Sequence, residues 1–174
     1  MPAIEPSDRA THVGPQQPRD LADWAVAIGG MVRRPFAAPL RELAASAGRK
    51  ALTSRVQCPD GVGTAGATFD GVRLADLIEQ AQPDGDARYV CIHSGAFTEA
   101  FPRGSIRRRG FLLADRRNGQ PLTWLEGGPL RLVVARGACS DTVKWVERVT
   151  LERDRSSATA ASMIRARRAA QPQG

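Results

Sequence analysis

The sequence predicts one α+β domain that is mostly β-sheet and carries a few short helices. Several short segments alternate apolar and polar residues with the two-residue period of strands. Only two or three segments show the wider apolar spacing of helices, and they follow no regular β-α-β order. At 174 residues, with 42% hydrophobic and 5% aromatic residues, the chain can bury one core built mainly of aliphatic side chains.

Two strands and a helix are predicted in the first third of the chain. Residues 23–29 alternate cleanly and end at a Gly-Gly pair, which predicts a strand and a turn. A short helix is expected from Pro39, because proline suits the first helical position. Residues 52–58 alternate again, so they predict a strand with Cys58 at its end, where Pro59 stops regular pairing.

The rest of the chain is expected to add short strands to the sheet. Residues 69–72 read as a turn that leads into a short helix carrying Leu74, Leu77 and Ile78. A further helical turn is expected at 142–146, capped by Ser140 or Asp141. The remaining strands are expected at residues 88–92, 111–113, 130–134 and 149–151.

Composition divides the chain into three parts. Residues 1–20 are rich in proline, glutamine and charge and form an N-terminal arm. Residues 21–152 form the folded domain. Residues 153–174 are a basic tail that we expect to be disordered or a frayed helix.

The net charge of +7 does not indicate a nucleic-acid partner, because of how the arginines are distributed. The arginine runs are expected in turns and at the C-terminus, and no basic stripe with interleaved aromatics accompanies them. No run of about 18 apolar residues is present, so no membrane span is predicted. No basic and apolar leader opens the chain, so we expect a cytoplasmic protein.

The three cysteines, Cys58, Cys91 and Cys139, are far apart and form no CxxC pair, which indicates a reducing compartment rather than a disulfide framework. Cys91 alternates with Tyr89 in a predicted strand, so we expect it to pack in the core. Strand alternation leaves two roles open for Cys58, a small buried hydrophobe or a ligand.

Residues 61–66 (GVGTAG) match the spacing G-x-G-x-x-G. In dinucleotide-binding domains the third glycine opens a long helix whose N-terminus meets the pyrophosphate. Here an extended segment and a turn follow instead, so a nicotinamide cofactor is not expected.

Six segments in order resemble the molybdopterin-binding domain of the sulfite oxidase family, and the resemblance covers roughly residues 9–152. The segments and the family patterns that they resemble are 23–32 (DWAVAIGGMV; W-x-L-x-I-x-G-x-V), 56–61 (VQCPDG; L-Q-C-x-G), 69–78 (FDGVRLADLI; W-x-G-V-x-L-x-D-L-L), 118–122 (NGQPL; N-G-x-P-L), 126–131 (EGGPLR; H-G-x-P-x-R) and 143–145 (VKW; V-K-W). The resemblance implies a mixed, mostly β fold that binds a molybdenum–molybdopterin cofactor.

The resemblance also implies site residues. The family's one protein ligand to molybdenum falls on Cys58, and an ionised thiolate is a soft ligand that suits such a metal. Positions that contact the pterin and its anionic phosphate fall on Arg131, Thr142, Val143 and Lys144; arginine, lysine and a backbone N–H at a helix start all suit an anion. Two alternatives stay open here: Arg131 as a solvated edge charge, and Lys144 as a helix-surface lysine.

His12 lies in a segment, residues 10–15 (ATHVGP), that is similar to the family's R-N-H-x-P-x-P, which wraps the pterin. If this holds, the cofactor orders the arm. The alternative is a lone histidine in a flexible tail.

The chain departs from the family at several positions. Glu126 replaces the histidine of H-G-x-P-x-R, and residues 94–97 (SGAF) lack the acid and the tyrosine of S-D-G-Y. The substrate arginines have no firm counterpart, although Arg55, Arg103 and Arg107 could supply positive charge. Sulfite is therefore not the expected substrate.

The resemblance implies an oxidoreductase that performs two-electron oxo transfer on a small substrate, with an unidentified electron-transfer partner. The alternative is a degenerate, cofactor-free domain of the same fold that binds an anion or a partner.

Overall fold

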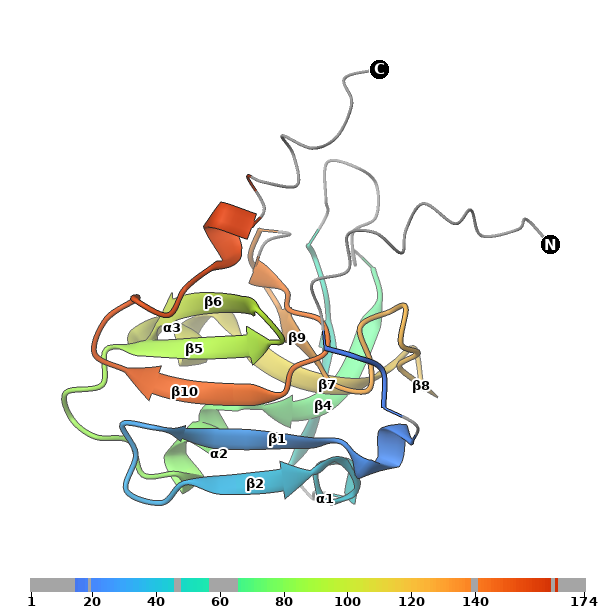
Figure 1. Ribbon diagram of the computed structural model, residues 1–174. Helices are drawn as coiled ribbons and strands as arrows, with labels where there is room; N and C mark the ends of the chain where they lie inside the picture. Colours follow the sequence, from blue (N-terminus) through green and yellow to red (C-terminus); the bar gives the residue numbers. More distant parts are fainter. Residues whose placement is uncertain are drawn as a thin grey trace.

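The computed structural model describes residues 15–18, 20–45, 48–56, 66–138, 141–163 and 165. Within this part of the chain two five-stranded sheets pack with a few short helices (Figure 1). The predicted α+β class with a dominant sheet is confirmed.

The first sheet has the order β2-β1-β10-β5-β6. Its strands are β1 (Ala25–Gly30), β2 (Phe36–Pro39), β5 (Tyr89–Ser94), β6 (Phe97–Pro102) and β10 (Arg148–Glu152). β1 and β10 pair in parallel, while the other pairs are antiparallel. A strand from near the end of the domain therefore lies at the centre of the sheet, between β1 and β5.

The second sheet is built on β7 (Phe111–Arg117), which pairs with β4, β8 and β9, all antiparallel. The other strands are β3 (Arg49–Thr53), β4 (Thr68–Arg73), β8 (Gln120–Pro121) and β9 (Arg131–Val134). β3 adds to the outer edge of β4. Its Arg49 reaches β7, where the guanidinium binds the carboxylate of the buried Asp115 at 2.5 and 3.3 Å.

Short helices accompany the sheets in the described part of the chain, among them the 3-10 helix η2 (Leu21–Asp23), α1 (Leu40–Ala45), α2 (Leu74–Gln80) and α3 (Arg103–Arg109). In Figure 1, α2 and α3 lie behind the first sheet. Leu74 and Leu77 of α2 and Ile106 of α3 are buried in the main core. No helix in the described ranges is long and apolar enough to cross a membrane.

The core has two parts, separated by the second sheet. The larger part includes Phe111 and Leu113 of β7, whereas Leu112 and Ala114, on the other face of the same strand, belong to the smaller part. β7 is thus buried on both faces, as its continuous apolar run requires. The alternating strand pattern of residues 23–29 is confirmed too, because Trp24, Val26 and Ile28 are all buried.

Several predicted boundaries are wrong. Pro39 does not open the helix but ends strand β2, where it pairs with Ala25, and α1 begins one residue later. The strand expected at 52–58 is the end of β3, which starts at Arg49 and stops at Thr53, although burial continues to alternate as far as Val56. The arginines at 107–109 lie in the last turn of α3 rather than in a turn between elements.

The turn expected at 69–72 is part of strand β4. In the sequence Gly71 suggests a turn, but in the structure it allows β4 to approach β7 closely. A Cβ at this position would overlap the backbone carbonyl of Leu113 in β7. The β4–β7 register also shifts between Asp70 and Gly71, which is typical of a β-bulge.

The helical turn expected at 142–146 is absent. Val143 instead forms a β-bridge with Leu132, and the N–H of Val146 donates to the carbonyl of Leu130 at 2.8 Å. The segment therefore contacts the β9 region at Val143 and again at Val146, with a bend at 144–145 between them, and both valines are buried in the core.

The first part of the predicted C-terminal tail contacts the first sheet. Thr159 exchanges two hydrogen bonds with the backbone of Thr98 in β6, both 2.9 Å long, and Ala160 is 1% exposed. Ser157 donates to Glu152 at 2.7 Å. The domain limits, 21–152 with an arm before and a tail after, stay a prediction.

Candidate functional site

Arg131 opens strand β9 on the face expected from the sequence. Its neighbours Leu130 and Leu132 belong to the larger core, so the arginine shares the opposite face with Val133. Nη1 donates to the carbonyl of Glu126 at 2.7 Å, while Nη2 lies 3.4 Å from the hydroxyl of Thr142. The solvated edge charge is therefore the wrong alternative: this guanidinium is held inside the fold.

The guanidinium of Arg131 also keeps an unused donor. Its Nε is buried and has no hydrogen-bond partner among the described residues. Burial, and to a lesser degree the positive charge of Arg117, lowers the pKa of Arg131 to about 10, against the opposing effect of Glu126. The side chain thus stays cationic at neutral pH and offers a free N–H to an anion.

Thr142, Val143 and Lys144 lie on the segment that pairs with β9 at Val143, next to Arg131. The Val143 side chain is buried, and its N–H points to the carbonyl of Leu132 at 3.3 Å. The helix-start donor expected at this point is thus absent. Lys144 is no helix-surface lysine either, since Nζ donates to the carbonyl of Leu125 at 3.0 Å and lies 5.3 Å from the centre of the Trp145 ring.

All three tryptophans of the chain gather next to these residues. The ring of Trp124 lies 6.1 Å from that of Trp24 and 5.4 Å from that of Trp145. Both outer rings are anchored by their indole N–H groups: Trp24 donates to Val146 and Trp145 to Trp124, each at 2.8 Å. This cluster fixes the loop at 122–128 against the segment that carries Lys144.

Glu126, at the histidine position of the family pattern, is tied down by its own loop. One carboxylate oxygen accepts from the N–H and the hydroxyl of Thr123 at 3.0 and 2.9 Å, while the other lies 3.2 Å from Nη1 of Arg117. The Thr123 N–H is the largest reason that the pKa of Glu126 is lowered. Its charge is therefore matched locally.

Arg117, which contacts Glu126, is a residue of the candidate site that the sequence pattern does not predict. It ends β7 just before the Asn118-Gly119 turn, and its Nε, like that of Arg131, is buried without a partner in the described part of the chain. The only signal in the sequence is its position immediately ahead of that turn.

Cys58 and His12 lie outside the described residues, as do residues 57–65 around the cysteine. The chain on either side of that segment is fixed. The N–H of Ser54 donates to Ala67, and the N–H of Gly66 donates back to Ser54, both at 2.9 Å. Ser54 and Val56 are buried, so both ends of the segment that carries Cys58 are anchored in the second sheet.

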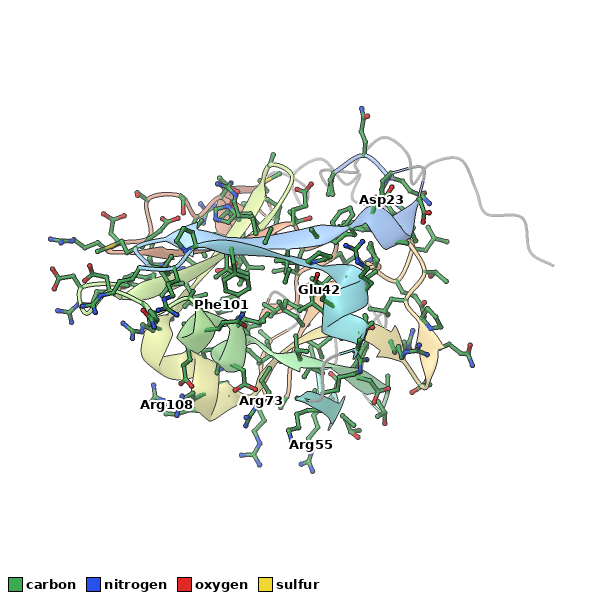
Figure 2. The ribbon with its side chains drawn as sticks, turned by 90° about the horizontal axis from the view of Figure 1, so that it is seen from below. Asp23, Glu42, Arg55, Arg73, Phe101 and Arg108 are labelled. Atoms are coloured by element: carbon green, nitrogen blue, oxygen red, sulfur yellow. The ribbon has the colours of Figure 1, made fainter. Side chains whose placement is uncertain are left out.

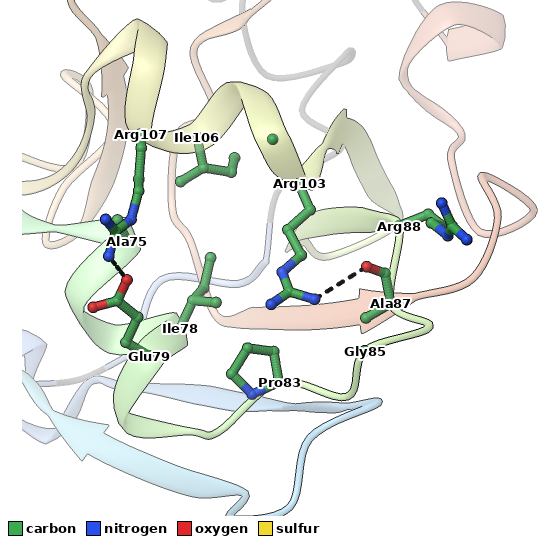
Figure 3. Close-up of a pocket in the computed structure, with 11 residues that line it drawn as sticks. Ala75, Ile78, Glu79, Pro83, Gly85, Ala87, Arg88, Arg103, Ile106 and Arg107 are labelled. Atoms are coloured by element: carbon green, nitrogen blue, oxygen red, sulfur yellow. Dashed lines mark hydrogen bonds and ion pairs between the residues drawn. The ribbon is translucent and has the colours of Figure 1, made fainter.

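The three arginines considered for substrate charge are not shown to meet. Arg103 and Arg107 line a cavity of about 440 Å³ between α2 and α3 (Figure 3). There Arg107 pairs with Glu79, and Arg103 donates to the carbonyl of Asp84 at 2.8 Å. Arg55 is exposed and points away from the ribbon (Figure 2). Arg131, Thr142, Val143 and Lys144 do not line this cavity.

Cys91 has the packing role expected for it. It is fully buried in β5, and burial raises the pKa of its thiol to about 11. Such a thiol stays protonated at neutral pH, so it is a poor metal ligand.

Comparison with known proteins identifies the family. The sequence model of a family described as the oxidoreductase molybdopterin binding domain matches residues 12–160. The chain belongs to this family. The expected resemblance is thereby confirmed, and the molybdopterin-binding domain takes a molybdopterin cofactor.

Relatives of this molybdopterin-binding domain differ in their named activities. The chain is 26% identical to a nitrate reductase (NADPH) of Fusarium oxysporum, over 83% of its own length and 19% of that protein. It is 26% identical to the uncharacterized oxidoreductase YuiH of Bacillus subtilis (78% and 68% covered) and 28% identical to the protein-methionine-sulfoxide reductase catalytic subunit MsrP of Xanthomonas axonopodis (66% and 40%). The chain thus spans about a fifth of the length of the nitrate reductases that it matches.

A solved structure shows the same fold. The sulfane dehydrogenase SoxCD from Paracoccus pantotrophus superposes with a TM-score of 0.71 at 21% identity, over 79% of this chain and 40% of that one. The sulfite-oxidase-like molybdopterin-binding fold is confirmed by this likeness.

The described residues fit an anionic cofactor. Arg117 and Arg131 each keep a buried Nε–H without a partner among the described residues, and a hydroxyl (Thr142) and an ammonium group (Lys144) lie on the adjacent segment. Unsatisfied buried donors are rare in folded proteins and mark a place where an acceptor belongs. That Arg131, Thr142, Val143, Lys144, His12 and Cys58 bind the cofactor stays a prediction.

Proposed function

We propose that the molybdopterin-binding domain is the catalytic part of an oxidoreductase that moves an oxo group to or from a small substrate. The family match over residues 12–160, together with a cysteine at the family's ligand position, supports this most strongly. When bound, the molybdenum cofactor would supply the two-electron redox chemistry.

The chain's own residues would bind and orient the cofactor. The thiolate of Cys58 would hold the metal, since a soft, ionised sulfur suits it. Arg131 would bind the phosphate through the donor that it does not use in the fold, with Thr142 and Lys144 beside it. Because these groups are fixed by β9 and by the tryptophan cluster, they need little rearrangement on binding.

The alternative, a cofactor-free binding module, is favoured by two departures from the family pattern: Gly95 in the segment that lacks the acid and the tyrosine, and Glu126, which places a carboxylate where the family has histidine. The support from Glu126 is weak, because the carboxylate is bonded to Arg117 and Thr123 and its charge is matched. Sulfite is not the favoured substrate, since no firm counterpart of the substrate arginines exists. Nitrate and sulfoxides are the first compounds to assay, as relatives are named for reducing them. A cytoplasmic location and a separate electron-transfer partner are part of the proposal.

Metal analysis tests the proposal directly. Wild-type protein produced with molybdate should contain close to one molybdenum per chain, whereas Cys58→Ala should lose most of it. Cys91→Ala is the matched control: it removes a buried, protonated thiol and should keep the metal. Equal and negligible molybdenum in wild type and Cys58→Ala would refute the proposal.

A further inference from the structure

Two arginines from neighbouring strands converge on one residue beside the proposed cofactor site. β7 and β9 are paired, with Ala114 opposite Arg131, and Arg117 follows three residues further along β7. Nη1 of Arg117 lies 3.2 Å from the carboxylate of Glu126, and Nη1 of Arg131 donates to the backbone carbonyl of the same residue at 2.7 Å. Glu126 therefore joins the two guanidinium groups into one cluster.

The cluster has more positive than negative charge. Arg117 and Arg131 carry two positive charges, whereas Glu126 contributes one carboxylate, which is bonded to Arg117 and not to Arg131. One positive charge is therefore left over. The charge of Arg117 is one of the causes that lower the pKa of Arg131, which places the two cations close enough to repel each other. A second anion would relieve this repulsion.

Each arginine of the cluster also has an N–H donor that the described chain does not use. Nε of Arg117 and Nε of Arg131 are the two buried side-chain nitrogen or oxygen atoms for which the described chain provides no hydrogen-bond partner. A buried donor without an acceptor costs free energy, and a phosphate has enough oxygens to accept from both side chains.

Glu126 is fixed independently of Arg117. Its second carboxylate oxygen is held by the backbone N–H and the hydroxyl of Thr123, so the carboxylate has one orientation in which to receive the arginine. The negative charge of Glu126 is compensated by Arg117, so a carboxylate at this position does not prevent an anion from binding nearby.

We propose that Arg117 is a second phosphate-binding cation of the cofactor site, positioned by Glu126, and that this pair stands in for the histidine of the family pattern. The inference deepens the proposed function and rests on it for the identity of the cofactor. Arg131 alone would bind the phosphate through one arginine, whereas the pair of arginines binds it from two strands.

Arg116 provides a matched control for Arg117. It is the preceding residue of the same strand, carries the same charge, is exposed and donates to the carbonyl of Gly119 at 3.2 Å. Arg116→Gln and Arg117→Gln therefore change the net charge equally, but only the second removes a member of the cluster.

The first measurement is the rate at which bound pterin leaves the loaded protein, followed by the fluorescence of the released pterin. Arg117→Gln should speed release about tenfold or more, because a charge-assisted contact is lost. Arg116→Gln should stay within about twofold of wild type. Arg117→Lys should fall between, since lysine keeps the charge without the planar fork. It is also the informative variant if Arg117→Gln does not fold.

The second measurement is the affinity of inorganic phosphate for full-length protein produced in a host that makes no pterin, by calorimetry. Arg117→Gln should weaken phosphate binding by a similar factor. In a Glu126→Gln background, Arg117→Gln should weaken phosphate binding by a smaller factor, since Glu126 no longer holds the Arg117 guanidinium. A general loss of stability would not produce this dependence on Glu126.

The outcomes separate the two proposals. If wild type binds no pterin but its phosphate affinity depends on Arg117, the proposed function fails and the anion site stands. If Arg117→Gln holds pterin and phosphate as tightly as wild type, in a protein that is loaded with the cofactor, the role of Arg117 is refuted and the function stands.

Discussion

His93 of β5 is a buried imidazole enclosed by hydroxyl groups. Nδ1 lies 3.0 Å from the hydroxyl of Thr98, and Nε2 lies 2.7 Å from that of Thr150. Arg148 approaches Nδ1 at 3.3 Å, while Glu152 lies 4.0 Å from Nε2. Burial first, and then the charge of Arg148, lowers the pKa of His93 below its ordinary value, against the effect of Glu152.

We expect this residue to make the protein less stable as the pH falls from 7 to 5. The folded state favours the neutral ring, whereas in the unfolded chain the ring takes up a proton near its ordinary pKa of about 6.5. The unfolded state therefore binds more protons in this window, and stability is lost by at most about 1.4 kcal/mol per pH unit until the folded ring protonates too.

Urea unfolding of wild type and His93→Gln at pH 7 and pH 5 measures this contribution. The comparison is necessary because Glu99, whose pKa is raised by burial, acts in the opposite direction. The loss of stability should be smaller in His93→Gln. An identical loss in both proteins would contradict the assignment.

The sequence predicts the orientation of a candidate-site residue where strand alternation determines which face of the sheet its side chain occupies. Alternation with Leu130 and Leu132 puts Arg131 on the opposite face of β9, and the structure has it there. Arg117 was not predictable, because its contact with Glu126 depends on the pairing of β7 with β9 and on the loop between them. Local sequence does not encode which residues such a loop brings together.

Strand β10 is the element that unites the first sheet. It pairs in parallel with β1 and antiparallel with β5, and Val149 and Leu151 are fully buried in the larger part of the core. Because β10 has a neighbouring strand on each edge, a cavity left by a smaller side chain on its buried face cannot easily collapse.

Leu151→Ala should therefore lower the free energy of unfolding by about 3 kcal/mol, within the range of large-to-small core substitutions. Leu125→Ala is the matched control, because this leucine is 67% exposed and the same change should cost no more than about 0.5 kcal/mol. Guanidinium unfolding of both variants provides the test, and similar effects of the two substitutions would contradict it.

At the level of elements, the sequence pattern predicts the strands with clean alternation or long apolar runs, which are β1, β5, β7, β9 and β10. It does not predict the edge strand β2 or the arginine-rich helix α3, since their composition is dominated by alanine and proline or by charge, and it also misses the edge strand β6. Gly71 shows why β4 was misjudged. A glycine that permits close strand contact looks, in sequence, the same as a glycine that permits a turn.

At the scale of the whole molecule, the proposed cofactor site draws on two segments that are distant in the sequence. The segment with Cys58 emerges from β3 and β4 at one edge of the second sheet, whereas Arg131 and Arg117 belong to β9 and β7 of that sheet. A cofactor that contacts both would join segments that are held together only through the sheet. Binding should therefore stabilise the fold as a unit.

We expect the thermal midpoint of loaded protein to exceed that of pterin-free protein. At a free cofactor concentration of 100 times its dissociation constant, the gain is about 2.7 kcal/mol, which is several degrees for a domain of this size. Calorimetry of both forms measures it. Equal midpoints for protein with and without bound pterin would argue against a cofactor that spans the two segments.

The central place of β10 has a consequence for how the chain is made. About 118 residues separate the end of β1 from the start of β10, so at typical rates the ribosome needs about 6 to 24 s to supply the partner of β1. For that time β1 has an open edge, and β5 has one while the last 54 or so of those residues are made; both edges can pair with other chains. Newly made protein should therefore depend on chaperones most strongly just before residue 148 emerges, and ribosomes stalled at that point would release the most aggregation-prone fragments.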